Sequence, residues 1–275
     1  MHNRKPPSNY GLNGATRILL ILTLILCSTK LTQAGSPEYL FIGNSFTIGS
    51  GDPDTTKLNG VPGMVALLAE SAGHEKPYVE KCTQAGYSLQ DHLKDSRKWN
   101  FHINKNKWTG VVLQEFSTVP TSADSGDHGN KDTFFECVEK IAKIVKSNNP
   151  KAKLYLFQTW ARGPTHNIYF NQFPEGPKQM YAELRESYQE AANLIDATLI
   201  PVGDAWELSQ EKRPDFNLYA KDRYHAQTRG SYLNALVIYS VIYDADPRGL
   251  PPLSTVSEED ANYLQEVAWQ TVSGE

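Results

Sequence analysis

The sequence predicts an α/β protein: a three-layer α/β/α sandwich built on a five-stranded parallel sheet. Short apolar runs alternate with stretches of helical periodicity between residues 39 and 272. Such an alternation implies right-handed crossover connections and a parallel sheet covered by helices on both faces. No internal repeat, linker or low-complexity tract interrupts the pattern, so we expect a single domain.

Five runs have the length and composition of buried strands. Gly110 to Gln114, for example, is short, apolar and β-branched, which favours a strand over a helix. The strands expected in chain order are residues 39–42, 77–81, 110–114, 152–157 and 198–202.

Helical periodicity separates these strands. A helix is expected from Val61, because Met64, Leu67, Leu68 and Ala72 recur at helical spacing and Pro62 suits a first turn. Residues 49–60 lack apolar periodicity and are expected to form a loop close to Ser45, the candidate nucleophile described below. The other expected helices are residues 134–146, 177–194, 229–243 and 258–272.

The first 34 residues have the pattern of an export signal. Arg4, Lys5 and Arg17 precede the apolar stretch Ile18 to Cys27, and Thr32-Gln33-Ala34 suits cleavage before Gly35. The apolar stretch is short for a membrane span of about 20 residues. We therefore expect a signal peptide at 1–34, a catalytic domain at 35–275 and a secreted or periplasmic protein without stable membrane insertion, the alternative being an uncleaved signal anchor.

Cleavage after Ala34 would leave an acidic chain with 23 basic and 31 acidic residues, a net charge of −8. An acidic chain without a basic run argues against nucleic acid as a partner. Cys82 and Cys137 would remain, and the sequence leaves open whether they pair, because it gives no distance between them.

Candidate catalytic residues lie near the two ends of this domain. Ser45 follows the first strand, in Gly43-Asn44-Ser45-Phe46-Thr47, and Asp222 and His225 form an Asp-x-x-His pattern near the other end. A serine hydroxyl needs a histidine to take its proton, and the histidine needs a carboxylate to orient it. In parallel sheets, ligands bind outside the carboxyl ends of the strands, where the sequence places Ser45, residues 82–86, 114–117 and 158–162.

In four blocks the chain resembles the SGNH hydrolase superfamily, the GDSL-type esterases and lipases. The blocks are Gly43 to Thr47, Gly86 in residues 84–88, Gln114-Glu115 after the third strand, and Asp222 with His225. Two positions depart from the usual pattern. Asn44 stands where many members have aspartate, and Gln114-Glu115 stands where most have Gly-x-Asn-Asp.

The resemblance implies a flavodoxin-like fold, an ester hydrolase and a role for each block. Ser45 would attack the carbonyl, His225 would accept its proton, and Asp222 would fix the imidazole. The backbone amides of Ser45 and Gly86 and the side-chain amide of Gln114 would form the oxyanion hole. The alternative for Gln114 is a hydrogen bond to neighbouring loop backbone.

Other polar residues compete for these roles. Asp204 follows the last strand and is the reserve for the triad acid, while Glu115 either orients Gln114 or caps a loop. Three further histidines lie in polar or turn-rich stretches and are expected at the surface: His92, His128 and His166.

Motifs of other catalytic classes are missing from the sequence. It lacks Gly-x-Ser-x-Gly, His-Glu-x-x-His, a paired-cysteine zinc pattern and a phosphate-binding Gly-x-x-x-x-Gly-Lys loop. We therefore expect no metal and no cofactor.

The expected substrate is a small ester or an acylated carbohydrate. Trp160 and Arg162 follow the fourth strand at the predicted catalytic edge, where an indole can stack on a sugar and a guanidinium can bind a carboxylate. Trp99, Trp108 and Trp206 are weaker candidates for stacking. The sequence thus predicts a secreted serine esterase that deacetylates a carbohydrate, with a noncatalytic carbohydrate-binding protein and an acyltransferase as alternatives.

Overall fold

Five parallel strands form the centre of the fold, in the order β2-β1-β3-β4-β5. In the computed structural model, which describes residues 35–49 and 51–275, the central strand β1 pairs with β2 and β3, and Tyr39 is aligned with Val79 and Gly110. The predicted five-stranded parallel sheet is confirmed. Its strands are β1 (Glu38–Gly43), β2 (Tyr78–Thr83), β3 (Gly110–Leu113), β4 (Lys153–Phe157) and β5 (Thr198–Ile200).

Alternate side chains of β1 belong to two separate cores, because successive strand residues point to opposite faces of a sheet. Tyr39 and Phe41 pack into one hydrophobic cluster, and Leu40 and Ile42 into the other. The apolar run therefore has no polar alternation, as expected for a strand buried on both sides.

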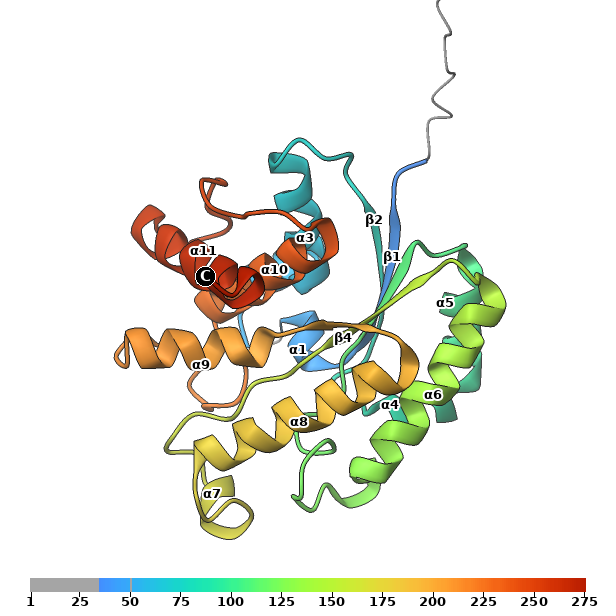
Figure 1. Cartoon of the computed structure of the whole chain (residues 1–275), viewed down its shortest axis with the longest axis horizontal. Helices are drawn as coiled ribbons and strands as arrows, with labels where there is room; N and C mark the ends of the chain where they lie inside the picture. Colours follow the sequence, from blue (N-terminus) through green and yellow to red (C-terminus); the bar gives the residue numbers. More distant parts are fainter. Residues whose placement is uncertain (1–34, 50) are drawn as a thin grey trace, which may run out of the picture. The chain divides into compact units, whose positions relative to one another are not determined.

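Helices cover both faces of the sheet, and Figure 1 shows the two layers with the strands between them. The first cluster includes residues of α3 (Gly60–Ser71), α9 (Val202–Lys212), α10 (Thr228–Tyr243) and α11 (Glu258–Ser273). The second includes residues of α4 (Leu89–Lys94), α5 (Ser96–Lys105), α6 (Lys131–Asn148) and α8 (Pro177–Ile195). Residues Gly35–Glu275 form one compact unit.

Several short helices differ from the sequence expectation. The predicted loop 49–60 contains α2 (Pro53–Lys57), which begins with a proline and is capped by Asp52, whose carboxylate accepts from the amides of Asp54 and Thr55. Such a helix is fixed by its cap rather than by apolar periodicity. The others are α1 (Ser45–Ile48), α4, α5, α7 (Ile168–Asn171), α9 and a 3₁₀ turn at Gly126–His128.

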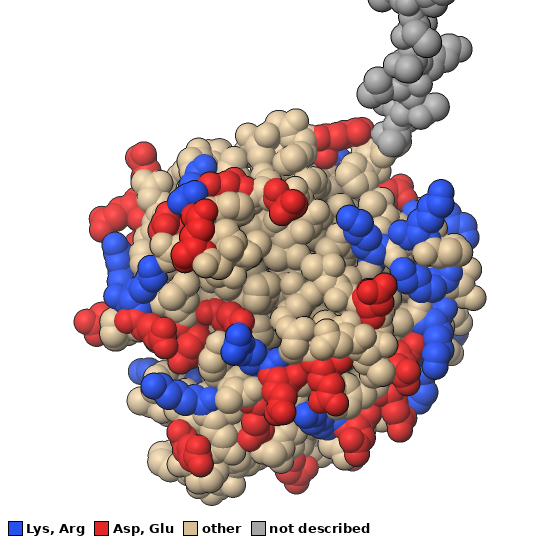
Figure 2. Space-filling view, viewed as in Figure 1, with Lys and Arg blue, Asp and Glu red and all other residues tan. Residues whose placement is uncertain are grey.

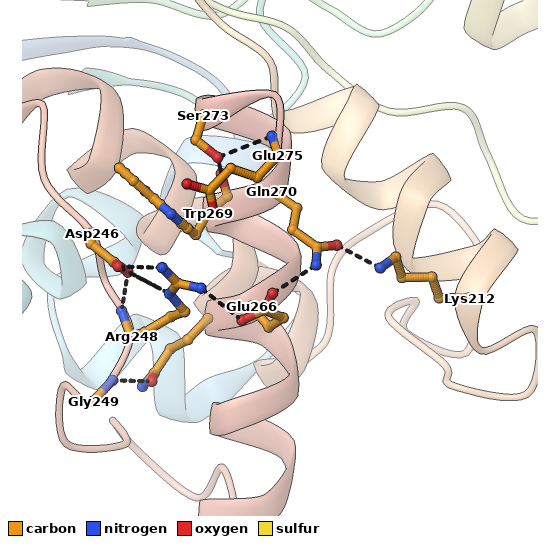
Figure 3. Close-up of polar contacts among 10 residues, drawn as sticks. Lys212, Asp246, Arg248, Gly249, Glu266, Trp269, Gln270, Ser273 and Glu275 are labelled. Carbon is orange, nitrogen blue, oxygen red and sulfur yellow. Dashed lines mark hydrogen bonds and ion pairs between the residues drawn. The ribbon is translucent and has the colours of Figure 1, made fainter.

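The C-terminal helix α11 is fixed to its surroundings by a polar network, shown in Figure 3. Arg248 pairs with Asp246 and reaches Glu266 on α11, and Gln270 joins Glu266 to Lys212 at the end of α9. On the face drawn in Figure 2, acidic and basic side chains surround a centre of uncharged residues.

Cys82 on β2 and Cys137 on α6 are both buried and are not joined to each other. Burial raises the pKa of the Cys82 thiol to about 11 and that of Cys137 to about 12. Both thiols are therefore protonated at neutral pH and behave as small apolar side chains.

The predicted signal peptide, residues 1–34, lies outside the described residues, and export stays a prediction. Within residues 35–49 and 51–275, no helix combines the length and the apolar character that crossing a membrane requires.

Candidate active site

Ser45 is the first residue of the short helix α1, which begins directly after the central strand β1. Asn44 caps this helix, because its Oδ1 accepts from the amide of Phe46 at 3.2 Å. Gly49 ends the helix in the left-handed conformation, and its N–H donates to the Ser45 carbonyl. The strand, the cap and the turn together fix the Ser45 backbone at the carboxyl edge of the sheet.

Gly43 is required at its position because two side chains lie against it. A Cβ atom there would come within 2.6 Å of both Gln114 Oε1 and Thr47 Oγ1. The glycine of the nucleophile block thus leaves room for the polar groups that hold the block in place.

Asp222 and His225 form a hydrogen-bonded pair. Asp222 Oδ2 lies 2.6 Å from His225 Nδ1, and its Oδ1 accepts from the amides of Tyr224 and His225. Partial burial raises the pKa of Asp222. The hydrogen bonds from the His225 side chain and from these two amides lower it by more than burial raises it, so the pKa lies below its ordinary value. The ionised carboxylate holds the proton on Nδ1 and leaves Nε2 as the acceptor.

The nucleophile segment and the histidine segment pack directly against each other. The ring of Phe46 meets the His225 ring edge-on at 5.8 Å, and a Cβ placed on Gly51 would lie 2.8 Å from His225 Cβ. Within the described part of the chain, no hydrogen bond joins Ser45 Oγ to His225. In hydrolases without substrate such bonds are often long and shorten when the substrate binds.

Asp204, the reserve for the triad acid, has different partners. It lies in the first turn of α9, accepts from Gln158 Nε2 at 2.9 Å and lies 3.4 Å from Arg185 Nε. The carboxylate that contacts His225 is therefore that of Asp222.

Two backbone amides at this edge are suited to an oxyanion hole. Among the hydrogen bonds of the described residues, neither the Ser45 N–H nor the Gly86 N–H is a donor. Gly86 has φ +78, and a Cβ built on it would meet open space. The left-handed backbone favours glycine here, and the open space lets an acyl group approach.

The Gln114 side chain is engaged in a buried network with the nucleophile block. Its Nε2 donates to Asn44 Oδ1 at 3.0 Å and to the Glu115 carbonyl, and its Oε1 accepts from Asn44 N and Thr47 Oγ1. Both N–H groups of this amide have acceptors, so none is left for an oxyanion in this arrangement. The contacts favour the alternative in which Gln114 holds the neighbouring backbone, and its predicted oxyanion role has no support in them.

The two departures from the usual family pattern contact each other. Asn44 accepts from Gln114 and donates from Nδ2 to the Tyr87 carbonyl at 2.9 Å, next to Gly86. An aspartate at position 44 has no N–H to donate to Tyr87. The Asn44–Gln114 amide pair therefore ties the nucleophile block, the glycine block and the end of β3 together.

Trp160 is a core residue, and the expectation that it stacks on a sugar is wrong. It is 1% exposed, with Phe46 stacked at 4.2 Å and Trp206 also at 4.2 Å. Its Nε1 donates to the Tyr224 carbonyl at 3.2 Å. Trp99, Trp108 and Trp206 are buried as well.

Arg162 lies half-buried near Asp222 and His225. Its guanidinium carbon is 4.2 Å from the centroid of the Tyr224 ring, and the Tyr224 ring is 4.4 Å from that of His225. Tyr224 was not predicted from the sequence, although its position directly before His225 is the signal that could have found it.

His92 was expected at the surface and is buried, with 1% exposure. One ring nitrogen, Nε2, lies 2.8 Å from the Gly43 carbonyl, and Nδ1 lies 3.9 Å from Cys82 Sγ. Desolvation lowers the pKa of His92 to about 4, so the ring is neutral at pH 7 and Nε2 donates to Gly43. His128 pairs with Asp91, and His166 accepts from the amide of Ile168; both are half-buried.

Glu115 caps a loop, which is one of the two roles expected for it. Its Oε1 accepts from the amides of Leu89, the first residue of α4, and Phe116. The carboxyl is 1% exposed, and desolvation raises its pKa to about 8. It is therefore mostly protonated at neutral pH.

Two cavities border the catalytic edge. The larger, about 1040 Å³, is lined by Asp222, His225 and Arg223, and the smaller, about 410 Å³, by Arg162, Phe116 and Phe170. Ser45 is 5% exposed and lines neither cavity. Among the residues that the structure describes, no three His, Cys, Asp or Glu side chains gather to hold a metal ion, and the absence of a cofactor stays a prediction.

Comparison with known proteins finds structural similarity only. No family model and no curated protein sequence matches the chain. A DUF4886 family protein from Bacteroides uniformis has 16% identity over 86% of this chain and 95% of its own, with a TM-score of 0.65. A protein from Slackia heliotrinireducens, proposed to be an SGNH hydrolase, has 22% identity over 75% and 99%, with a TM-score of 0.58.

A variant of an acetyl xylan esterase from Geobacillus stearothermophilus has 15% identity over 80% of this chain and 97% of its own, with a TM-score of 0.52. The chain thus has the α/β fold of the SGNH hydrolases.

Proposed function

We propose that this protein is a serine ester hydrolase of the SGNH type. The observation that carries the proposal is the 2.6 Å contact between Asp222 and His225, on a segment that packs against the helix beginning at Ser45. A histidine with one nitrogen fixed by a carboxylate can take a serine proton on its other nitrogen, which is how a hydroxyl group is activated.

The reaction would proceed in two steps. Ser45 Oγ attacks the ester carbonyl while His225 Nε2 takes its proton, and the Ser45 and Gly86 amides bind the developing oxyanion. His225 then protonates the leaving alcohol, and water releases the acyl group by the same route in reverse. Each oxyanion donor typically stabilises the transition state by about 2.7 to 4 kcal/mol.

We propose an acylated carbohydrate as the substrate and acetyl as the acyl group. The cavity beside Asp222 and His225 is lined mainly by polar side chains, including Gln210, Asn217 and Gln227, which suit sugar hydroxyls. The structural similarity to an acetyl xylan esterase supports the same class of substrate. For such a substrate we also propose export through the signal peptide at residues 1–34.

Hydrolysis of a p-nitrophenyl ester series by the purified protein tests the activity. We expect turnover that is highest for acetate and lost in Ser45→Ala. If wild-type protein and Ser45→Ala are equally inactive on all chain lengths, the noncatalytic carbohydrate-binding alternative gains support. Faster acyl transfer to a sugar acceptor than to water would instead identify an acyltransferase that uses the same serine.

A further inference from the structure

Basic side chains line both cavities near Asp222 and His225. Lys221 and Arg223 flank Asp222 in the sequence and line the larger cavity, and Arg162 lines the smaller one. The segment 162–167 borders both cavities, because Pro164 lines the larger and Asn167 the smaller. A hydrogen bond from Gly163 N to the Arg223 carbonyl joins this segment to the catalytic loop.

The hydrogen-bond partners of the Arg162 side chain are neutral groups. Its guanidinium lies over the Tyr224 ring, with Nη2 3.4 Å from Ser117 Oγ and Nη1 3.4 Å from His166 Nε2. Its buried Nε has no hydrogen-bond partner within the described residues. A half-buried guanidinium of this kind retains capacity for an anion.

Some basic side chains of the described chain pair with carboxylates, and others, such as Arg97 and Arg213, have no ion pair among residues 35–49 and 51–275. Lys57, Arg229 and Arg248 each contact a carboxylate within 3 Å. By contrast, the ion pairs among residues 35–49 and 51–275 include none with Arg162, Lys221 or Arg223. The three cations at the catalytic edge are thus available to a ligand.

The carboxylates that line the same cavities already accept hydrogen bonds from other groups of the protein. Asp52 caps α2 and also bonds the Thr55 hydroxyl, and Asp222 holds His225. Asp124, at the smaller cavity, is exposed and accepts from the Gly126 amide. The two cavities together are lined by three cations and three carboxylates, so a ligand there meets a balanced charge rather than the net negative charge of the chain as a whole.

We propose that the substrate is an acylated anionic polysaccharide, whose carboxylate or sulfate groups bind Arg162 at the smaller cavity and Lys221 with Arg223 at the larger one. Phe170, which is 84% exposed and lines the smaller cavity, offers a flat apolar face to a sugar ring beside Arg162. This inference rests on the proposed ester hydrolase for the position of the acyl group, but polymer binding can be measured without catalysis.

Titration calorimetry with the Ser45→Ala protein tests the inference directly. The probes are polygalacturonate for carboxylates, a sulfated galactan for sulfate esters, and neutral xylan. We expect at least one anionic polymer to bind about 10-fold or more tightly than xylan, with affinity that falls as salt is added. The tighter of the two anionic polymers identifies the group recognised, and equal affinity for all three polymers would overturn the proposal.

Matched variants locate the binding site. Arg162→Gln should weaken binding of the anionic polymer by about 10-fold. Arg213→Gln removes a guanidinium that stacks on Tyr263 and lines neither cavity, and it should leave binding unchanged. The exposed double variant Lys221→Gln/Arg223→Gln gives the same test without a buried substitution. Equal affinity in these variants and in the Arg213 control would contradict the proposal.

Phe170→Ala should also weaken binding of the anionic polymer. Phe101→Ala is the control, because it likewise removes an exposed ring, on α5, and it should leave binding unchanged. The two proposals fail separately. If Ser45→Ala binds the anionic polymer but wild-type protein hydrolyses no ester, the anionic subsite is supported and the esterase proposal is contradicted. Hydrolysis with no preference for anionic polymers would do the reverse.

Discussion

Trp160 joins the Ser45 segment to the His225 segment of the candidate site by contacts with Phe46 and Tyr224. Its indole Nε1 donates to the Tyr224 carbonyl at 3.2 Å, and its ring stacks on Phe46, the residue after Ser45. Trp206, on the other face, fixes this column to α10 through a 2.7 Å hydrogen bond to Asn234. The position of His225 relative to Ser45 thus depends on an aromatic column in the core.

Trp160→Phe should reduce both stability and turnover. The change leaves the Tyr224 carbonyl without its donor, which typically costs about 1 to 3 kcal/mol when the group is buried. Thermal unfolding and kcat measure the two effects. Trp108→Phe is the matched control, because Trp108 is equally buried and donates to the carbonyls of His102 and Ile103. It should lower the melting temperature and spare kcat; an equal loss of kcat in both variants would contradict the account.

Asp222→Asn should lower kcat by about 10³ to 10⁴ while the fold persists, because an amide no longer favours the productive tautomer of the imidazole. Asp204→Asn, which perturbs a carboxylate bonded to Gln158, should have a far smaller effect. Steady-state kinetics on p-nitrophenyl acetate distinguish the two. The opposite ranking would move the acid role to Asp204, and two mild effects would indicate a Ser45–His225 dyad.

Asn44 and Gln114 should be energetically coupled. Gln114→Ala leaves the backbone N–H of Asn44 and the hydroxyl of Thr47 without their acceptor. We therefore expect the protein to lose both stability and kcat. A double-mutant cycle with Asn44→Ala, measured by urea unfolding, should give a coupling free energy above about 1 kcal/mol.

The control is a second cycle that combines Asn44→Ala with Gln265→Ala. Gln265 is a buried amide that donates to the Tyr232 hydroxyl, and the losses in unfolding free energy of these two variants should be additive within about 0.5 kcal/mol. If Gln114→Ala lowers kcat by about 10² to 10³ without any change in stability, its amide acts on the oxyanion after all.

The buried Glu115 carboxyl should make the protein less stable as the pH rises. Its folded-state pKa, about 8, is above the ordinary value near 4.5. Its contribution to stability is therefore fully present below pH 4.5 and is lost as the pH rises through 8, by at most about 1.4 kcal/mol per pH unit. Glu115→Gln keeps an acceptor for Leu89 and Phe116 and should remove this dependence.

Urea unfolding between pH 7 and 8.5 measures the difference between wild-type protein and Glu115→Gln. His92 does not interfere in this range, because its pKa, about 4, is lowered and its contribution is lost only as the pH falls below about 6.5. Parallel curves for the two proteins above pH 7 would show that Glu115 does not titrate there.

The sheet was predictable because buried parallel strands are continuous apolar runs, and each expected run became a strand with bounds shifted by at most two residues at either end. The long helices were predictable from their periodicity. Helices such as α2 and α4 were missed because they are fixed by capping: the Ser88–Asp91 capping box of α4 matches a recognisable sequence pattern, S-x-x-[DE].

The contact between Asp222 and His225 was predictable because the two residues are three positions apart in one turn. What the sequence did not reveal depends on contacts between distant segments. Gln114 and Asn44 are 70 residues apart, and either could satisfy several partners. Trp160 could not be distinguished from a surface aromatic residue, because only the packing of Phe46 and Trp206 on both its faces shows that it is buried.

Covalent labelling of Ser45 tests the central claim most directly. The intact protein is treated with a dialkyl p-nitrophenyl phosphate, which phosphorylates an activated serine, and the modified residue is located by peptide mass spectrometry. We predict one adduct per chain, on Ser45, formed at a rate that falls strongly in His225→Ala. Labelling that is absent, that occurs on another residue, or that proceeds equally fast without His225 would contradict the assignment of Ser45, His225 and Asp222 as a catalytic triad.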